Sequence, residues 1–426
     1  MDQQAIWAIG IFAAAYALIV SEKIHRTIVA MIGGLLVIAL GIVDQETALH
    51  HIDFNTLGLL IGMMIIVAVS ADTGAFAYAA VWAAKKAKGR PVPIMIALAL
   101  LTAVASAFLD NVTTILLMVP ISFSIARQLG FSPIPLLITQ VLASNVGGTA
   151  TLIGDPPNIM IGSAVKELTF GAFLANLAPI AVIVMAAYVP LFALLYREQL
   201  RTTPERMRSL MDMDQSELIT DAKLLVKSLS VLGLTILGFF LHQALHLESA
   251  AVALSGAFLL LLITGEHRME EAFKKIEWPT IFFFAGLFVL VSGLVETGVM
   301  ADLAAKAIEL TDGNVAAASM LILWLSAIAS AFLDNIPFVA TMIPLIQEMG
   351  ARGIDNLEPL WWSLALGACL GGNGTLIGAS ANLIAAGLSA KEGHPIRFVA
   401  YMKVAFPLML LSVALAAGYI YVRYLI

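Results

Sequence analysis

The feature that most constrains this chain is an internal repeat that relates its two halves without a gap. The string SAFLDN occurs twice, and Asp110 in the first copy corresponds to Asp334 in the second (334 − 110 = 224). The same shift of 224 aligns Gly62 with Gly286, Gly147 with Gly371, Thr151 with Thr375 and Asn158 with Asn382. Because chance does not supply such a register, we expect two similar halves, 1–200 and 223–426, joined by a polar linker, 201–222.

Composition places both halves in a lipid bilayer. Hydrophobic residues make up 60% of the chain and charged residues 12%, whereas about a quarter of the residues of a soluble domain are charged. A helical span needs roughly 20 apolar residues, so we predict an all-α polytopic membrane protein with about ten spans. The single cysteine, Cys369, excludes a disulfide scaffold, and the net charge of −6 offers no basic surface for nucleic acid.

Two stretches in each half are unlike plain spans. In the first half, one carries an Asp-Asn pair in mid-run (106–120) and the other gathers glycines, threonines and two prolines (144–158). Irregular backbone survives at membrane depth only where protein buries it or where it lines a cavity. We therefore expect a re-entrant hairpin with the Asp-Asn pair at its tip, and a broken helix, within 91–165 and again within 314–390. These transport elements would be short, half-spanning pieces, and the remaining helices a scaffold.

The distribution of lysine and arginine predicts how the repeats lie in the membrane. With five crossings and one hairpin in each half, the second half enters inverted. Nineteen of the 23 basic residues then fall in loops on one side, which places that side in the cytoplasm. Both termini would face the periplasm or cell exterior, in a bacterial inner (plasma) membrane. Inverted repeats with broken helices are typical of secondary transporters, not of enzymes.

Three carboxylates are candidates for proton coupling. Asp110 and Asp334 lie in apolar runs, where an ionised carboxylate costs at least ~2.5 kcal/mol. Burial favours the protonated form and a nearby cation favours the ionised form, so such a group can bind a proton in one state and release it in another. Each could equally cap a helix at its hairpin tip. Asp155 has no acidic counterpart, because Ala379 occupies the equivalent position of the second half. Asp155 either makes the half-sites unequal, by adding a second carboxylate to that of Asp110, or is an ordinary helix N-cap.

Unwound backbone and neutral side chains complete the predicted site. Broken helices expose carbonyl groups for a cation and helix N-termini for an anion. No lysine or arginine lies within these motifs, which favours a neutral hydroxylated solute, a cation or a weakly held anion. We expect no cofactor and no resident metal, with the proton as coupling ion and sodium as the alternative. The predicted substrate- and ion-binding residues are Asp110, Asn111, Asn145, Thr149, Thr151, Asn158, Asp334, Asn335, Asn373, Thr375 and Asn382.

The motifs resemble the ion transporter superfamily, in the branch that holds the arsenite permeases and the P protein. The resemblance is carried by FLDNVTTILLMVP (108–120), SNVGGTATLIGDPPNIMIGS (144–163), FLDNIPFVATMIP (332–344) and GGNGTLIGASANLIAAG (371–387). It implies an elevator-type carrier, in which the hairpins and broken helices move against the scaffold. It also implies a small inorganic solute as substrate, and suggests a homodimer and a soluble ATPase partner.

The resemblance and the site chemistry favour efflux of arsenite or antimonite, as the neutral trihydroxide, in exchange for protons. A sodium-proton antiporter and a transporter of chloride or another anion are the alternatives. A different class, an intramembrane aspartyl protease, is suggested by the string from Leu152 to Asp155. That string has leucine where the protease motif has its first glycine, which disfavours the protease.

Overall fold

The computed structural model describes residues 3–21, 23–214, 216–265 and 267–426, and within these ranges every regular element is a helix. The first half forms α1 Gln3–Ser21, α2 Arg26–Ala39, α3 Gln45–His50, α4 Phe54–Ala71, α5 Ala75–Lys86, α6 Pro91–Phe108, α7 Asn111–Leu129, α8 Ile134–Thr149, α9 Pro156–Ala164 and α10 Phe170–Tyr196. The linker contains α11 Pro204–Asp212 and the short turn η1 Ser216–Leu218. The second half forms α12 Ala222–Leu241, α13 Ser249–Thr264, α14 His267–Lys274, α15 Trp278–Glu296, α16 Val299–Leu310, α17 Val315–Phe332, α18 Asn335–Ala351, α19 Glu358–Gly371, α20 Ser380–Lys391, α21 Phe398–Ile420 and η2 Tyr421–Leu425.

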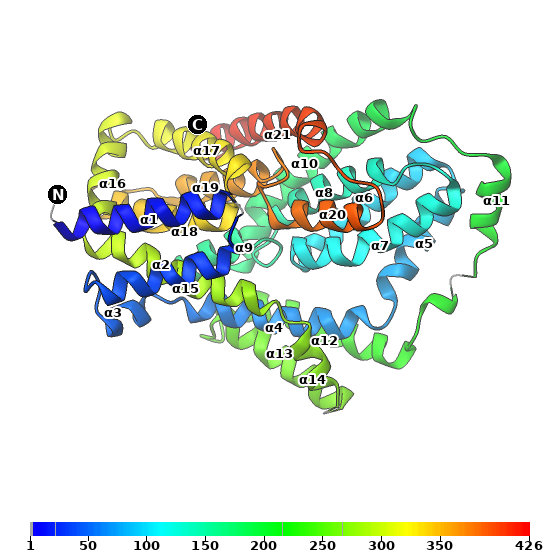
Figure 1. Ribbon diagram of the computed structural model, residues 1–426, viewed down its shortest axis with the longest axis horizontal. Coiled ribbons are helices and arrows are strands. Elements are labelled where there is room, and N and C mark those ends of the chain that lie inside the picture. Colours follow the sequence, from blue (N-terminus) through cyan, green and yellow to red (C-terminus); the bar gives the residue numbers. More distant parts are fainter. Residues whose placement is uncertain (1–2, 22, 215, 266) are drawn as a thin grey trace.

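The helix order repeats as the sequence predicts. Each of α1 to α10 has a counterpart in the same position among α12 to α21. Counterparts lie toward opposite ends of the long axis. In Figure 1, α16 and α18 of the second half lie toward the left, and their counterparts α5 and α7 lie toward the right. This is the arrangement that two inverted repeats produce.

The two halves are interleaved at their scaffold helices. Helix α2 of the first half packs along α15 of the second, and α4 packs along α13, which is the same contact with the halves exchanged. The crossings need glycine, because a Cβ atom at Gly62 would lie 2.6 Å from the backbone of Ala253, and one at Gly286 would lie 2.7 Å from the backbone of Ala30. Small residues at such crossings are typical of helix pairs in membranes.

Hydropathy agrees with a polytopic protein. Within the described residues, nine helices are long and apolar enough to cross a bilayer, and the apolar α2 and α13 are shorter. The expectation that the hairpin arms are half-spanning is wrong: α6 and α7 have 18 and 19 residues, close to the roughly 20 of a full crossing. Only the second parts of the broken helices, α9 and α20, are short, with 9 and 12 residues.

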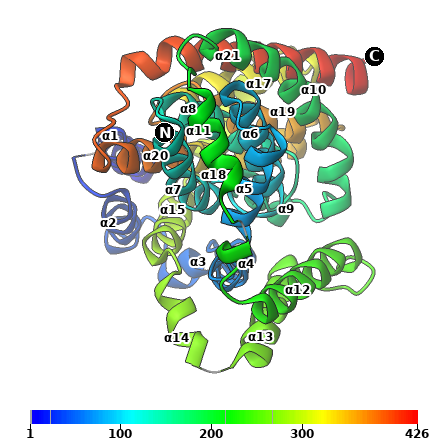
Figure 2. The same cartoon turned by 90° about the vertical axis from the view of Figure 1, so that its right-hand side faces the viewer.

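The helices separate into an outer group and a central group. In Figure 2, α4, α12 and α13 lie together at one side, away from α10 and α21. The hairpins α6–α7 and α17–α18 pack on the broken helices α8–α9 and α19–α20. The linker lies against the end of the first hairpin, where the Thr202 hydroxyl donates to the carbonyl of Leu129 at 2.6 Å. The central group carries all of the predicted site residues.

Candidate functional site

Both hairpin tips are built on an aspartate that caps the second arm. In the first hairpin, the backbone N–H of Thr113 donates to Asp110 Oδ1 at 2.8 Å, and the Thr113 hydroxyl donates to the other carboxylate oxygen. In the second, the N–H of Ile336 donates to Asp334 Oδ1 at 3.1 Å. Capping, one of the two roles expected for these carboxylates, is therefore present at both tips.

The broken helices are braced by asparagine side chains. Helix α8 ends at Thr149, and α9 begins at Pro156. Proline has no backbone N–H, and this has no cost in the first turn of a helix, where the N–H groups have no partner within the helix. The Asn158 amide bridges the break by donating to the carbonyls of Thr149 at 3.1 Å and Thr151 at 2.8 Å. Asn382 bridges the second break by donating to the carbonyls of Gly372 and Thr375, both at 2.8 Å. The sequence predicts that the broken helices expose carbonyl groups for a cation. This expectation is wrong for the carbonyls that accept hydrogen bonds from Asn158 and Asn382.

Hydroxyl groups tie each hairpin to its broken helix. The Thr151 hydroxyl donates to the carbonyl of Ala107 on the first hairpin, and the Thr375 hydroxyl donates to the carbonyl of Ala331 on the second. All four residues are buried. Each hairpin and its broken helix are thus held together by side-chain bonds out of contact with solvent, which favours their behaviour as one unit.

Glycine permits the close approach behind these bonds. A Cβ atom at Gly147 would overlap the carbonyl oxygen of Ala103 on α6, and one at Gly371 would overlap that of Ala327 on α17. The two glycines are repeat counterparts, and so are the two alanines. The hairpin and the broken helix therefore cross at the same glycine and alanine positions in both halves.

Four asparagines meet where the halves join, and we call them the amide centre: Asn111, Asn145, Asn373 and Asn382. Asn145 Nδ2 donates to the Oδ1 atoms of Asn373 at 2.9 Å and Asn382 at 3.0 Å. Asn145 Oδ1 accepts from Asn111 Nδ2 at 3.1 Å. All four side chains are buried. The centre is uncharged and links the first hairpin to both broken helices.

Asp155 lies beside the second hairpin, not the first. Its carboxylate is buried and accepts from Asn335 Nδ2 at 3.2 and 3.5 Å, and it makes no capping bond to α9. The expectation that Asp155 adds its charge to the tip of its own half is therefore corrected, because the break carries it across to the other hairpin. Cys369, the repeat counterpart of Asn145, is also buried and contacts Asn158 Oδ1 at 3.6 Å.

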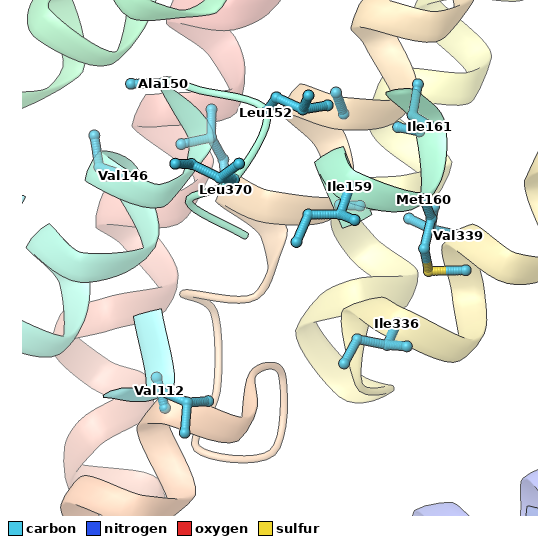
Figure 3. Close-up of a cluster of buried hydrophobic side chains, with 14 of the residues drawn as sticks. Val112, Val146, Ala150, Leu152, Ile159, Met160, Ile161, Ile336, Val339 and Leu370 are labelled. Atoms are coloured by element: carbon cyan, nitrogen blue, oxygen red, sulfur yellow. The ribbon is translucent and has the colours of Figure 1, made fainter. Parts of the chain in front are cut away.

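Apolar side chains enclose this polar region. Figure 3 shows Val112 and Ile336 at the two hairpin tips, with Leu152 and Ile159 at the first break and Met160 beside Val339 of α18. These side chains are buried. In such surroundings a hydrogen bond is stronger than in water and an unpaired polar group is costly. The amide centre is therefore a rigid arrangement in this state of the molecule.

A basic residue that the motifs do not contain reaches the second hairpin. Arg26, in the first turn of α2, forms an ion pair with Asp334 (Nη1 to Oδ2, 2.5 Å) and donates to the Ser380 hydroxyl at 2.7 Å. Ser380 in turn donates to Asp334 Oδ2 at 2.9 Å. The expectation of a site without basic groups is thus wrong. The repeat counterpart of Arg26 is Ala250, so an arginine at the start of a span in one half, with no basic counterpart in the other, was the signal available in the sequence.

A cavity of about 310 Å³ borders this ion pair. Its polar lining comes from Tyr16, His25, Arg26, Asp334 and Ser380, and the rest of the wall is mainly apolar. Among the described residues, Asp110 forms no salt bridge, so the two hairpin carboxylates differ in their partners.

The predicted site residues therefore form four groups. Four of them meet in the amide centre, Asp155 meets Asn335, and the two tip aspartates lie at separate helix ends. Thr151, Thr375 and Asn158 hold the backbone together, and the hydroxyl of Thr149 donates to the carbonyl of Asn145 at 2.7 Å. Asp334 is paired with a cation and borders a cavity, whereas Asp110 has no ion pair among the described residues.

Comparisons with known proteins agree with this architecture. Residues 16–367 match the model of the CitMHS family, described as citrate transporter. An uncharacterized transporter of Mycobacterium tuberculosis is 43% identical over 99% of both chains, and the P protein of Mus musculus is 35% identical over 100% of this chain and 61% of its own length. The YdaH transporter of Alcanivorax borkumensis shares the fold, with a TM-score of 0.61 at 13% identity over 99% of this chain and 98% of that one.

These similarities, the repeat and the broken helices identify a membrane transporter, and the chain belongs to the CitMHS family of the ion transporter superfamily.

Proposed function

We propose that this transporter couples proton movement to solute movement, with Asp334 as the group that binds and releases the proton. The observation that carries the proposal is the ion pair between Arg26 and Asp334, which joins a scaffold helix to a hairpin tip. Arg26 stabilises the ionised carboxylate while the two are in contact. Once they separate, the buried carboxylate loses its cation, and the protonated form is favoured. Proton binding and separation of the pair then occur together.

The contacts support movement of the hairpins and broken helices as one body. Hydroxyl bonds join each hairpin to its own broken helix, and Asn145 joins the two halves through Asn373 and Asn382. The scaffold would be α1, α2, α4, α12, α13 and α15, which gives an elevator-type motion. Arg26 of α2 and Asp334 lie on opposite sides of the boundary, so the motion would break their ion pair.

Arsenite or antimonite, as the neutral trihydroxide exchanged for protons, is the first candidate solute. The amide centre supports it, because carboxamide groups both donate to and accept from hydroxyls and carry no charge. Cys369 is a single buried thiol, so recognition would rest on hydrogen bonds and not on the several thiolates that trivalent arsenic prefers.

A small anion is the second candidate, and Arg26 is the observation that favours it. A guanidinium group in a mainly apolar cavity is a strong ligand for a carboxylate or another anion. The family description, citrate transporter, points to the same class of solute. Sodium has weaker support, because asparagine amides occupy several carbonyls that would otherwise coordinate it.

Transport into everted membrane vesicles under an imposed pH gradient tests these proposals. Arsenite, chloride, acetate, citrate and sodium are added separately, and collapse of the gradient is followed with a pH-sensitive dye. A response to arsenite supports the first candidate, a response to an anion supports the second, and a response to sodium alone contradicts both. Solute uptake that proceeds with no effect on the gradient contradicts proton coupling itself.

We further propose a bacterial inner membrane location with both termini outside and the linker in the cytoplasm. The distribution of basic residues supports it, and α11 lies at the far end of the molecule from the start of α1 in Figure 1. Reagent labelling of cysteines placed in the linker and near Gln3 would test the orientation. A homodimer and a soluble ATPase partner stay as proposals from the family resemblance, to be tested by co-purification.

A further inference from the structure

We infer that Arg26 and Ser380 form an anion-binding site, that the Asp334 carboxylate occupies it in this state, and that a small monocarboxylate replaces Asp334 when Asp334 carries a proton. The inference deepens the second candidate of the proposed function, because it names the site and the class of anion. It concerns binding, so it can be tested without transport.

Arg26 and Ser380 hold the Asp334 carboxylate as a binding site would hold a carboxylate ligand. Asp334 Oδ2 accepts from Arg26 Nη1 at 2.5 Å and from the Ser380 hydroxyl at 2.9 Å. Arg26 lies in α2 and Ser380 in the first turn of α20, so the donors come from two elements far apart in the sequence. Ala379 precedes Ser380 and makes no side-chain cap, so no other side chain caps this helix start. A free carboxylate could use the same donors with the same geometry.

The polarity of the cavity decides the class of anion. The cavity holds about 310 Å³ beside the ion pair, roughly the volume of ten water molecules, so a small carboxylate fits with room to spare. Its walls include the apolar side chains of Ile19, Phe332, Leu383 and Ile384. One guanidinium neutralises one carboxylate. A monocarboxylate with a short apolar chain, such as propionate, therefore fits better than a tricarboxylate, whose further charges would face hydrocarbon.

The exchange balances in charge and in protons. Asp334 takes one proton, loses its charge and releases Arg26; the anion then brings one negative charge to the same guanidinium. The other titratable groups around the ion pair are His25, which precedes α2, Tyr16 on α1, Asp155 at the start of α9, and Glu277, which precedes α15 and interacts electrostatically with Arg26 and Asp110. Tyr16 donates to the carbonyl of Pro337 and lies 2.8 Å from Thr341 Oγ1, so its hydroxyl is already engaged.

Binding of propionate to the purified full-length protein tests this inference. Titration calorimetry at pH 7.5 is carried out on the wild type, Asp334→Asn, the double variant Arg26→Gln/Asp334→Asn, and Ser380→Ala/Asp334→Asn. We expect Asp334→Asn to bind propionate at least roughly tenfold more tightly than the wild type, because the competing carboxylate is gone. The further loss of Arg26 should weaken binding by at least roughly tenfold, and that of Ser380 by a smaller factor. In the wild type, propionate should bind more tightly at pH 5.5 than at pH 7.5.

Matched controls separate a specific site from general charge effects. Arg127→Gln removes an arginine that does not line the cavity and whose exposed ion pair with Glu392 lies at the other end of α20 from Ser380, and it should leave propionate binding unchanged. His25→Asn tests whether the neighbouring histidine, and not Asp334, carries the pH dependence. The double variant loses both charges of the pair, so it leaves no unpaired buried charge to prevent folding.

Two results would overturn the inference. One is equal propionate affinity in Asp334→Asn and the wild type; the other is equal affinity in Asp334→Asn and the double variant with Arg26→Gln. Citrate or chloride binding more tightly than propionate would overturn the class of anion. These outcomes are distinct from failure of the proposed function, because a protein that transports only arsenite against protons could still bind propionate here, and a propionate transporter could lack this site.

Discussion

The tips of the two hairpins have the same backbone and different surroundings. At the first tip, Asp110 is engaged by Thr113 of its own helix, and at the second, Asp334 is engaged by Arg26 and Ser380 from two other elements. The repeat counterpart of Arg26 is an alanine, so the duplication itself did not supply the ion pair. The comparison shows that a duplicated fold can retain its helix breaks and hairpins while one copy acquires a charge partner that the other lacks.

A second contrast lies behind the tips. Asn145 joins three other asparagines, whereas its counterpart Cys369 contacts one amide oxygen. Asp155, which has no acidic counterpart, lies against Asn335. The second hairpin thus has an ion pair with arginine and a hydrogen bond to Asp155 at its tip, and among the described residues Asp110 at the first tip has no ion pair. The unequal half-sites give the two hairpins unequal roles in a common motion.

The largest effect on stability should come from Arg26→Gln, which removes the cation and leaves Asp334 buried. We expect a loss of about 3 kcal/mol at pH 8, because an uncompensated buried charge remains. Thermal unfolding in detergent measures this loss, with Arg127→Gln as the exposed control. The double variant Arg26→Gln/Asp334→Asn should recover most of the loss; no recovery would mean that Arg26 acts by packing.

The next effect should be the same in both halves, because it concerns the shared crossing of hairpin and broken helix. Gly147→Ala and Gly371→Ala each place a Cβ atom against a backbone carbonyl, and we expect each to cost about 2 kcal/mol. Unfolding temperature measures this, with Gly10→Ala, which meets no atom within 4 Å, as the matched control. A large difference between the two variants would show that the halves do not share this device.

An unequal pair of effects, the second of them the smallest, should come from the counterparts Asn145 and Cys369. Asn145→Ala leaves buried amide groups of three partners without their bonds, for which we expect a loss of about 2 kcal/mol. Cys369→Ala removes only weak thiol contacts, with Asn158, Asp155 and Thr149, and should cost about 1 kcal/mol or less. The same unfolding assay compares them. Equal losses would mean that the amide centre is not what distinguishes the two half-sites.

Much of the fold could be predicted from the sequence because its signals are local. The repeat register of 224 residues predicts two matching halves, and the Asp-Asn pair and the proline and glycine cluster each mark a break in the helices. In the first half, α6 ends and α7 begins at the Asp-Asn pair, and α8 ends and α9 begins at the proline and glycine cluster. The predicted half-spanning length is wrong because the outer ends of the hairpin lie at Pro91, which begins α6, and at Gly130, which follows α7, nearly a full span from the tip.

The partners of the site residues could not be predicted, because they depend on how distant helices pack. Nothing near Arg26 in the sequence indicates that the start of α2 lies against a hairpin 308 residues away. Asp155 precedes two prolines and has the pattern of a helix cap, yet the unwound segment turns its side chain toward Asn335. Asn158 could be predicted as polar and buried, but not as a brace across its own break.

The most direct test of the account compares proton-coupled transport by Asp334→Asn and Asp110→Asn in everted vesicles, with the solute that the wild type carries. The account predicts that Asp334→Asn abolishes collapse of the pH gradient while solute counterflow persists. Asp110→Asn, which retains a side-chain oxygen able to cap α7, should keep at least about a third of the coupled rate. Loss of coupling in Asp110→Asn with coupling retained in Asp334→Asn would contradict the assignment of the proton to the second hairpin.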